Sequence, residues 1–251
     1  MKIDLNCDLG ESFGIYKIGN DREIMDYVTS VNIACGFHAG DPEIMVKTVQ
    51  SAIEKDVSIG AHPGYPDLQG FGRRMMQMSH DALRASILYQ VGALKAIVEA
   101  CGGRLNHVKP HGALYNLASK DYDVALVIAR AIYDIDPELI FMGLAESQMI
   151  KAGRDIGLKV AAETFADRRY DENLKLVPRG ISGAVIEDIH HSIDQCIDII
   201  AKQEVTDING EKRCLKGDSI CIHGDNQKGI DLVKLLRQSL KNQDIQVEAL
   251  R

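Results

Sequence analysis

Seven short apolar segments, most of them followed by a stretch with helical periodicity, constrain the fold of this chain more than any other feature. Buried parallel strands are expected at residues 3–7, 30–34, 57–61, 105–108, 139–142, 159–162 and 219–222. A strand followed by a helix, repeated along the chain, is typical of a parallel sheet covered by helices. Because 251 residues is the usual size of one such barrel, the pattern predicts a single seven-stranded (β/α) barrel domain over residues 1–251.

The expected helices have recognisable first and last residues. Asp41, followed by a proline, and Ser79 are the expected N-caps of the helices that follow the second and third predicted strands. Ser119 is the expected N-cap of a later helix, and further helices are expected near residues 146–157, 186–200 and 230–240.

Residues 205–215 depart from this alternation of strand and helix. Their central Asn209-Gly210 pair is a strong signal of a two-residue hairpin turn. We therefore expect a small β-hairpin inserted before the last strand of the barrel.

Composition indicates which kinds of partner and which cellular location to expect for this chain. The formal net charge of -7 argues against binding to nucleic acid or to anionic membranes, because both need a basic surface. No run of 18 apolar residues is present and the N-terminus is charged, so we expect a cytoplasmic protein. The six cysteines include no C-x-x-C pair, which argues against a zinc ribbon or a redox dithiol. Small molecules and proteins are the expected partners.

Titratable residues recur just after the predicted strands. In the stretch NIACGFHAGDP, for example, His38 follows the second predicted strand. The residues that share this position are Asp8, Glu11, His38, Asp41, His62, Asp67, Lys109, His111, Glu163, Asp167, His223 and Asp225. Because the loops after barrel strands converge on one mouth, we expect an active site there.

Strand alternation indicates which polar side chains face the barrel interior. Asp4, Asn6 and Asp8 share one face of the first strand, whereas its apolar residues face the helices. The same alternation groups His107, Lys109 and His111, and it groups Cys221, His223 and Asp225. Buried polar groups are costly unless they pair with one another or bind a ligand. A self-contained polar network therefore stays an alternative, but four histidines at four equivalent strand ends favour a ligand site.

Arginines near the predicted mouth indicate an anionic ligand. Arg73 and Arg74 follow the Gly- and Pro-rich loop after the third strand. Arg168 and Arg169 follow the sixth strand, and Arg179 follows a proline in an apolar stretch. Guanidinium groups suit carboxylates and phosphates. Neither G-x-x-x-x-G-K-[ST] nor G-x-G-x-x-G occurs, so the usual nucleotide-binding motifs are absent.

Seven motifs taken together resemble the LamB/YcsF family from the first predicted strand to the last. They are DLNCDLGE, NIACGFHAGDP, GAHPGYPD with FGRR, VKPHGALYN, AETFADRRY, LVPRG and CIHGDN. The resemblance implies a (β/α) barrel of the glycoside hydrolase/deacetylase type. It also implies ATP-dependent opening of 5-oxo-L-proline to L-glutamate together with 5-oxoprolinase subunits B and C, with ATP as a co-substrate handled largely by those partners.

The mouth residues match the groups that this reaction needs. Opening an unactivated lactam requires a base, stabilisation of a developing oxyanion and a proton for the leaving nitrogen. We assign Asp8 as general base, Lys109 as stabiliser of the carbonyl oxygen or its phosphorylated form, and His111 as proton donor. The other expected catalytic residues are His38, His62 and His223, and the expected substrate-binding residues are Asn6, Arg73, Arg74, Glu163 and Arg179.

Two other functions stay open. A stand-alone metal-dependent amide or carbohydrate deacetylase would use aspartate and histidine ligands at the same mouth. A non-catalytic subunit would instead bind a small acid and deliver it to the enzyme proper. The residues also leave open whether a divalent metal is bound and whether the chain forms a homo-oligomer.

Overall fold

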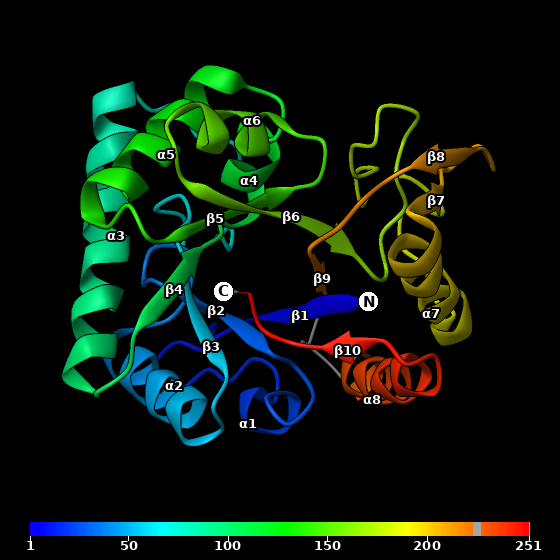
Figure 1. Ribbon diagram of the computed structural model, residues 1–251. Helices are drawn as coiled ribbons and strands as arrows, with labels where there is room; N and C mark the ends of the chain where they lie inside the picture. Colours follow the sequence, from blue (N-terminus) through cyan, green and yellow to red (C-terminus); the bar gives the residue numbers. More distant parts are fainter. Residues whose placement is uncertain (223–226, 251) are drawn as a thin grey trace.

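The computed structural model, which describes residues 1–222 and 227–250, has a closed barrel of seven parallel strands at its centre (Figure 1). The strands pair in the order β1 (Lys2–Leu9), β2 (Ser30–Ala34), β3 (Ser58–His62), β4 (Leu105–Val108), β5 (Ile140–Leu144), β6 (Lys159–Phe165) and β9 (Ser219–Cys221). The barrel closes where β9 pairs with β1. All seven predicted strands are therefore confirmed, with small shifts at their ends.

Helices cover the outside of the barrel (Figure 1). The longer ones are α2 (Pro42–Glu54), α3 (His80–Ala100), α5 (Tyr122–Ile135), α6 (Gln148–Asp155), α7 (Ile189–Ile197) and α8 (Gln227–Asn242). Asp41 and Ser79 cap α2 and α3 as predicted, since their side chains accept hydrogen bonds from first-turn N–H groups. The prediction for Ser119 is wrong. The Asp121 carboxylate caps α5, whereas Ser119 ends α4 (Gly112–Ala118), a short helix that the sequence did not predict.

The predicted hairpin is confirmed, although residues 207–211 connect its strands and not a two-residue turn. It consists of β7 (Glu204–Thr206) and β8 (Lys212–Cys214), which pair antiparallel beside α7 at one side of the barrel (Figure 1). The other unpredicted elements are α1 (Asp21–Ile24), the π-helix η1 (Asp198–Lys202) and β10 (Gln246–Val247), which pairs with the start of β1. Among the described residues, no helix is both long and apolar enough to span a bilayer.

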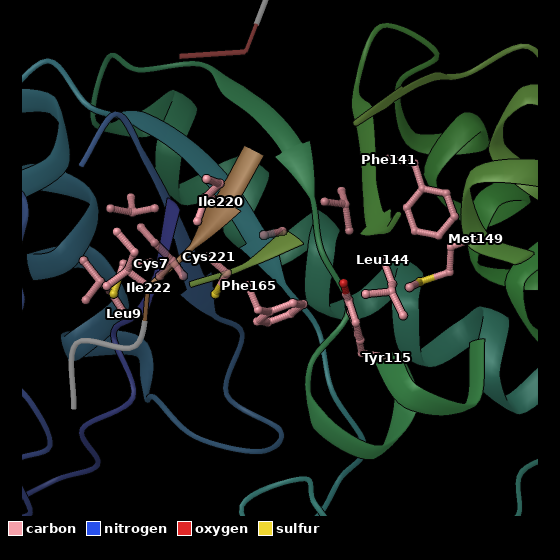
Figure 2. Close-up of a cluster of buried hydrophobic side chains, with 14 of the residues drawn as sticks. Cys7, Leu9, Tyr115, Phe141, Leu144, Met149, Phe165, Ile220, Cys221 and Ile222 are labelled. Atoms are coloured by element: carbon pink, nitrogen blue, oxygen red, sulfur yellow. The ribbon is translucent and has the colours of Figure 1, made fainter. Parts of the chain in front are cut away.

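The main apolar core lies between the barrel and its helices. Leu5, Cys7 and Leu9, alternate residues of β1, belong to this core, as strand alternation predicts. In Figure 2, Cys7, Leu9 and Ile222 lie on one side of the drawn cluster, and Phe141 and Met149 lie on the other. The remaining side chains of β1 are thereby directed into the barrel.

The barrel interior has an apolar side and a polar side. Ile140, Met142 and Ala161 from β5 and β6 form a small apolar cluster that is separate from the main core. On the polar side, Asn32 Nδ2 donates hydrogen bonds of 2.8 Å to Asn6 Oδ1 and to Asp8 Oδ1. The polar side chains of β1 and β2 therefore pair with one another and hold the strand ends in a defined arrangement.

The closed end of the polar side holds a buried carboxylate. Thr29 and Ser30 donate hydrogen bonds of 2.8 and 2.6 Å to Asp4 Oδ1, and Ser219 donates to the other oxygen. Burial raises the pKa of Asp4. The self-contained polar network considered from the sequence is thus present at this end of the barrel.

Candidate functional site

A cavity of about 430 Å³ opens at the carboxyl ends of the barrel strands. Its volume is in the range of small-molecule sites. One part of its lining consists of Asp8, Glu11, His62, Lys109 and His111, and another part includes Arg73, Arg168, Lys175 and Arg179. Residues at the ends of different strands therefore converge on one mouth, as barrel geometry predicts.

A buried lysine lies between two carboxylates at the floor of the cavity. Lys109 Nζ is 2.9 Å from Asp8 Oδ1 and 2.7 Å from Glu163 Oε1. Burial alone would lower the pKa of Lys109, but the Asp8 and Glu163 carboxylates hold it well above its usual value. Burial would also raise the pKa of Asp8, but His62 and Lys109 hold it well below the usual range. Both Asp8 and Lys109 are therefore charged at neutral pH.

Asn6 and Glu163, two of the expected substrate-binding residues, lie behind Lys109. Both are fully buried. Lys109 Nζ donates to Asn6 Oδ1 at 3.3 Å, and the Tyr115 hydroxyl donates to Glu163 Oε2 at 2.7 Å. In this arrangement Asn6 and Glu163 position Lys109, and Tyr115, which the sequence did not single out, positions Glu163.

Three histidines and a glutamate gather beside Asp8. His62 Nε2 is 3.3 Å from Asp8 Oδ2 and 2.9 Å from His111 Nδ1. The His38 ring stacks on the His111 ring with 3.7 Å between centroids, and His38 Nε2 is 3.3 Å from Glu11 Oε1. The one remaining predicted mouth histidine, His223, lies outside the described residues.

Gly72 leaves room for the stacked rings. Its φ of +64° lies in the left-handed region that favours glycine. A Cβ at this position would also lie 2.7 Å from His38 Cβ and 2.8 Å from His111 Cδ2. The backbone conformation and the packing of the two rings therefore require the glycine of the FGRR motif, whereas its arginines contribute charge.

The two stacked histidines are neutral at neutral pH. Burial and the neighbouring His62 lower the pKa of His111 to about 3, and burial and His111 lower the pKa of His38. His111 Nε2 already donates a hydrogen bond of 2.8 Å to the Phe71 carbonyl oxygen. The role of His111 as proton donor stays a prediction.

The arginines divide into two groups. Arg73 and Arg179 line the cavity, whereas Arg74 forms an ion pair with Asp67 on the neighbouring loop. Arg168 also lines the cavity and is 7% exposed. The sequence placed it among the arginines near the mouth but not in the expected substrate-binding set. Burial and the nearby Arg179 lower the pKa of Arg168, so this wall of the cavity favours an anion.

Buried cysteines are poor candidates for a nucleophile here. All six are free thiols, and Cys221 Sγ lies 3.3 Å from Lys109 Nζ. Burial raises the pKa of Cys221 well above its usual value and that of Cys35 to about 12. Neither thiol is therefore ionised at neutral pH.

Curated relatives share nearly the whole length of this chain. The A subunit of 5-oxoprolinase from Alkaliphilus metalliredigens is 51% identical over 246 residues, which cover 98% of this chain and 96% of the relative. The corresponding 5-oxoprolinase chain of Bacillus subtilis is 50% identical over 249 residues, which cover 99% of this chain and 97% of the relative.

Solved structures agree with the barrel architecture. The lactam utilization protein from Thermus thermophilus has 39% sequence identity and a TM-score of 0.95, with 100% of both chains covered. A family 4 carbohydrate esterase from Streptomyces lividans has 10% identity and a TM-score of 0.50, with 100% of this chain and 93% of that chain covered, which shows a shared fold alone. The LamB/YcsF family model matches residues 3–251. As the sequence motifs predicted, the chain belongs to the LamB/YcsF family.

Proposed function

We propose that this chain is one component of a 5-oxoprolinase and takes part, with subunits B and C, in the ATP-dependent hydrolysis of 5-oxo-L-proline to L-glutamate. The observation that carries this proposal is one cavity with the Asp8–Lys109 pair at its floor and arginines on its wall. The names of the relatives at about 50% identity, and the lactam utilization protein of the same fold, support the same substrate.

The floor of the cavity supplies groups that lactam hydrolysis needs. Hydrolysis of an amide requires a base near the attacking water and positive charge near the carbonyl oxygen. In this proposal the ionised Asp8 orients the water and accepts its proton. The Lys109 ammonium stabilises negative charge on the carbonyl oxygen or on its phosphorylated form. Glu163 and Asn6 hold Lys109 in position from behind.

The arginine wall supplies an anchor for the substrate carboxylate. Arg168 is the most buried of the cavity arginines, and its Nη2 donates to the Val177 carbonyl oxygen at 2.6 Å. Its Nε is buried and has no hydrogen-bond partner among the described residues. A carboxylate bound there would accept this hydrogen bond, with Arg73 and Arg179 adding positive charge from the rim.

Arg168→Met is expected to lower kcat/KM for 5-oxo-L-proline by about 10- to 100-fold, mainly through KM. Loss of a hydrogen bond to a charged group typically costs about 1.5 to 3 kcal/mol, and an anchor acts on ground state and transition state alike. Steady-state kinetics of the assembled complex measure this effect. Arg168→Lys should recover part of it, and the exposed Arg104→Met is the matched control. An unchanged KM in a folded Arg168→Met variant would remove Arg168 from substrate binding.

Reconstitution tests the proposed function directly. Glutamate release from 5-oxo-L-proline and ATP is measured with this chain alone, with the B and C partners alone, and with all three. We expect turnover with all three only. We assign ATP binding largely to the partners, because the usual nucleotide motifs are absent here, and we place the complex in the cytoplasm, where ATP is available. ATP-coupled turnover by this chain alone, or full turnover without it, would contradict the proposal.

A metal-dependent deacetylase is the second candidate function. The cluster of Glu11 with three histidines and the fold shared with a carbohydrate esterase favour it. Such an enzyme would release acetate from N-acetylated sugars without ATP and without partner subunits. The 5-oxoprolinase proposal expects no acetate release in that assay.

A further inference from the structure

Four potential metal ligands lie together at the mouth of the barrel. Glu11, His38, His62 and His111 each offer one ligand atom, and these atoms all lie within 4.8 Å of one another. All four residues are buried. They lie at or just after the ends of four consecutive barrel strands, so the fold and not a local sequence motif brings them together.

Backbone carbonyl groups determine which ring nitrogens carry protons. His62 Nδ1 is 2.7 Å from the Lys109 carbonyl oxygen, and His111 Nε2 is 2.8 Å from the Phe71 carbonyl oxygen. A carbonyl oxygen only accepts hydrogen bonds, so both of these nitrogens must carry the proton. The other nitrogens of the two rings, His62 Nε2 and His111 Nδ1, are the ones that point toward each other.

These two nitrogens face each other at a distance of 2.9 Å. A ring nitrogen that carries no proton has a lone pair available to a metal ion. The buried Nδ1 of His38 has no hydrogen-bond partner among the described residues. The three histidines and Glu11 therefore bring together the ligand types that a divalent transition metal binds.

Two of the spacings between ligand atoms, and the backbone partners of two of the histidines, match those of a metal site. Glu11 Oε1 lies 3.3 Å from His38 Nε2 and 3.6 Å from His111 Nδ1. Two ligands of one tetrahedral zinc ion, each about 2.0 to 2.2 Å from it, are about 3.3 to 3.6 Å apart. Metal-binding histidines also typically donate their other N–H to a backbone carbonyl, as His62 and His111 do here.

We propose that Glu11, His38, His62 and His111 bind one divalent transition-metal ion, with zinc the best match to three imidazoles and a carboxylate. Glu11, His62 and His111 also line the cavity, so an ion held by them would be accessible to a small-molecule ligand. The proposal of a metal site rests on these contacts alone and does not depend on whether the chain acts on 5-oxo-L-proline.

Metal titration tests the site without any measurement of turnover. The chain is dialysed against a chelator and then titrated with Zn²⁺ in a calorimeter, and separately with Co²⁺ while its visible absorption is recorded. We expect one ion per chain and the visible bands of Co²⁺ bound to nitrogen and oxygen ligands. A wild-type chain that binds neither ion would overturn the proposal, and this result requires no variant to fold.

Matched variants locate the ion. His62→Gln and His111→Gln should weaken Zn²⁺ binding by more than about 100-fold, because even loss of a residue that only orients a ligand costs about 10- to 100-fold. The exposed His191→Gln is the control and should bind as the wild type does. Thermal melting checks that each variant is folded. Equal Zn²⁺ affinity in the wild type and in both folded mouth variants would place the ion elsewhere and refute the assignment.

Discussion

Replacing Asp8 with asparagine is expected to lower turnover of the reconstituted three-subunit complex by about 10²- to 10⁴-fold, the usual effect of losing an acid–base group. Asparagine has nearly the shape of aspartate and can still accept the hydrogen bonds from Asn32 and Lys109. Lys109 also keeps its ion pair with Glu163. The variant should therefore fold while losing the charge that accepts a proton.

Asp4→Asn is the matched control for this experiment. Asp4 lies on the same strand and the same face as Asp8, but at the closed end of the barrel, where three hydroxyl groups bind it. The Asp4→Asn variant should change the stability of the chain and leave kcat close to that of the wild type. If Asp8→Asn retains full turnover in the complex, the chain is a substrate-binding subunit without a catalytic role for Asp8.

Lys109→Met is expected to destabilise the chain by about 3 to 5 kcal/mol at neutral pH, the typical result of breaking a buried ion pair. Methionine fills much of the volume of the lysine stem, but it leaves two carboxylates, Asp8 and Glu163, without their common positive partner. Equilibrium unfolding in urea measures the change. Adding Glu163→Gln to Lys109→Met removes one of these charges and should recover part of the loss.

The stability difference between the wild type and Lys109→Met depends on pH through the pKa shifts of Asp8 and Lys109. The pKa of Asp8 is depressed in the folded chain, so its stabilisation is present above about pH 4, the unfolded value, and is lost as pH falls further. The pKa of Lys109 is raised, so its stabilisation is present below about pH 10 and is lost at higher pH. The difference in the free energy of unfolding between the wild type and Lys109→Met should be largest between these two pH limits.

A surface lysine provides the control for Lys109. Lys159 pairs with Glu138 at 3.3 Å, and both side chains are more than half exposed. Lys159→Met should therefore change stability by about 0 to 1 kcal/mol, the usual range for exposed pairs. An equally small change for Lys109→Met would show that the buried carboxylates find other partners.

Local sequence signals predicted most of the fold. Asp41, Ser79 and the Asn209-Gly210 pair act through hydrogen bonds and backbone preferences within a few residues, so their effects do not depend on distant parts of the chain. Ser119 and Asp121 are both good caps, two residues apart. The Ser119 carbonyl accepts a hydrogen bond from Gln148 N at the start of α6, a contact between separate elements that no local pattern predicts.

Strand alternation likewise predicted that Asp8 and Lys109 face the barrel interior, but it did not predict their partners. Glu163 was expected to contact substrate and instead lies behind Lys109. Arg74 was expected beside Arg73 at the cavity and instead pairs with Asp67. In both cases the deciding factor is the direction of a long side chain, which depends on neighbours from other strands and loops.

The sequence by itself determined the repeating strands and helices, the polar face of β1 and the set of chemical groups at the strand ends, because each depends on spacing along the chain. Only the tertiary structure decided which of those groups pair, which stay charged and which face a common centre. Those properties depend on burial and on distances across the barrel, where the Lys109 and Phe71 carbonyls orient His62 and His111. Residues far apart in sequence become one site only when the barrel closes.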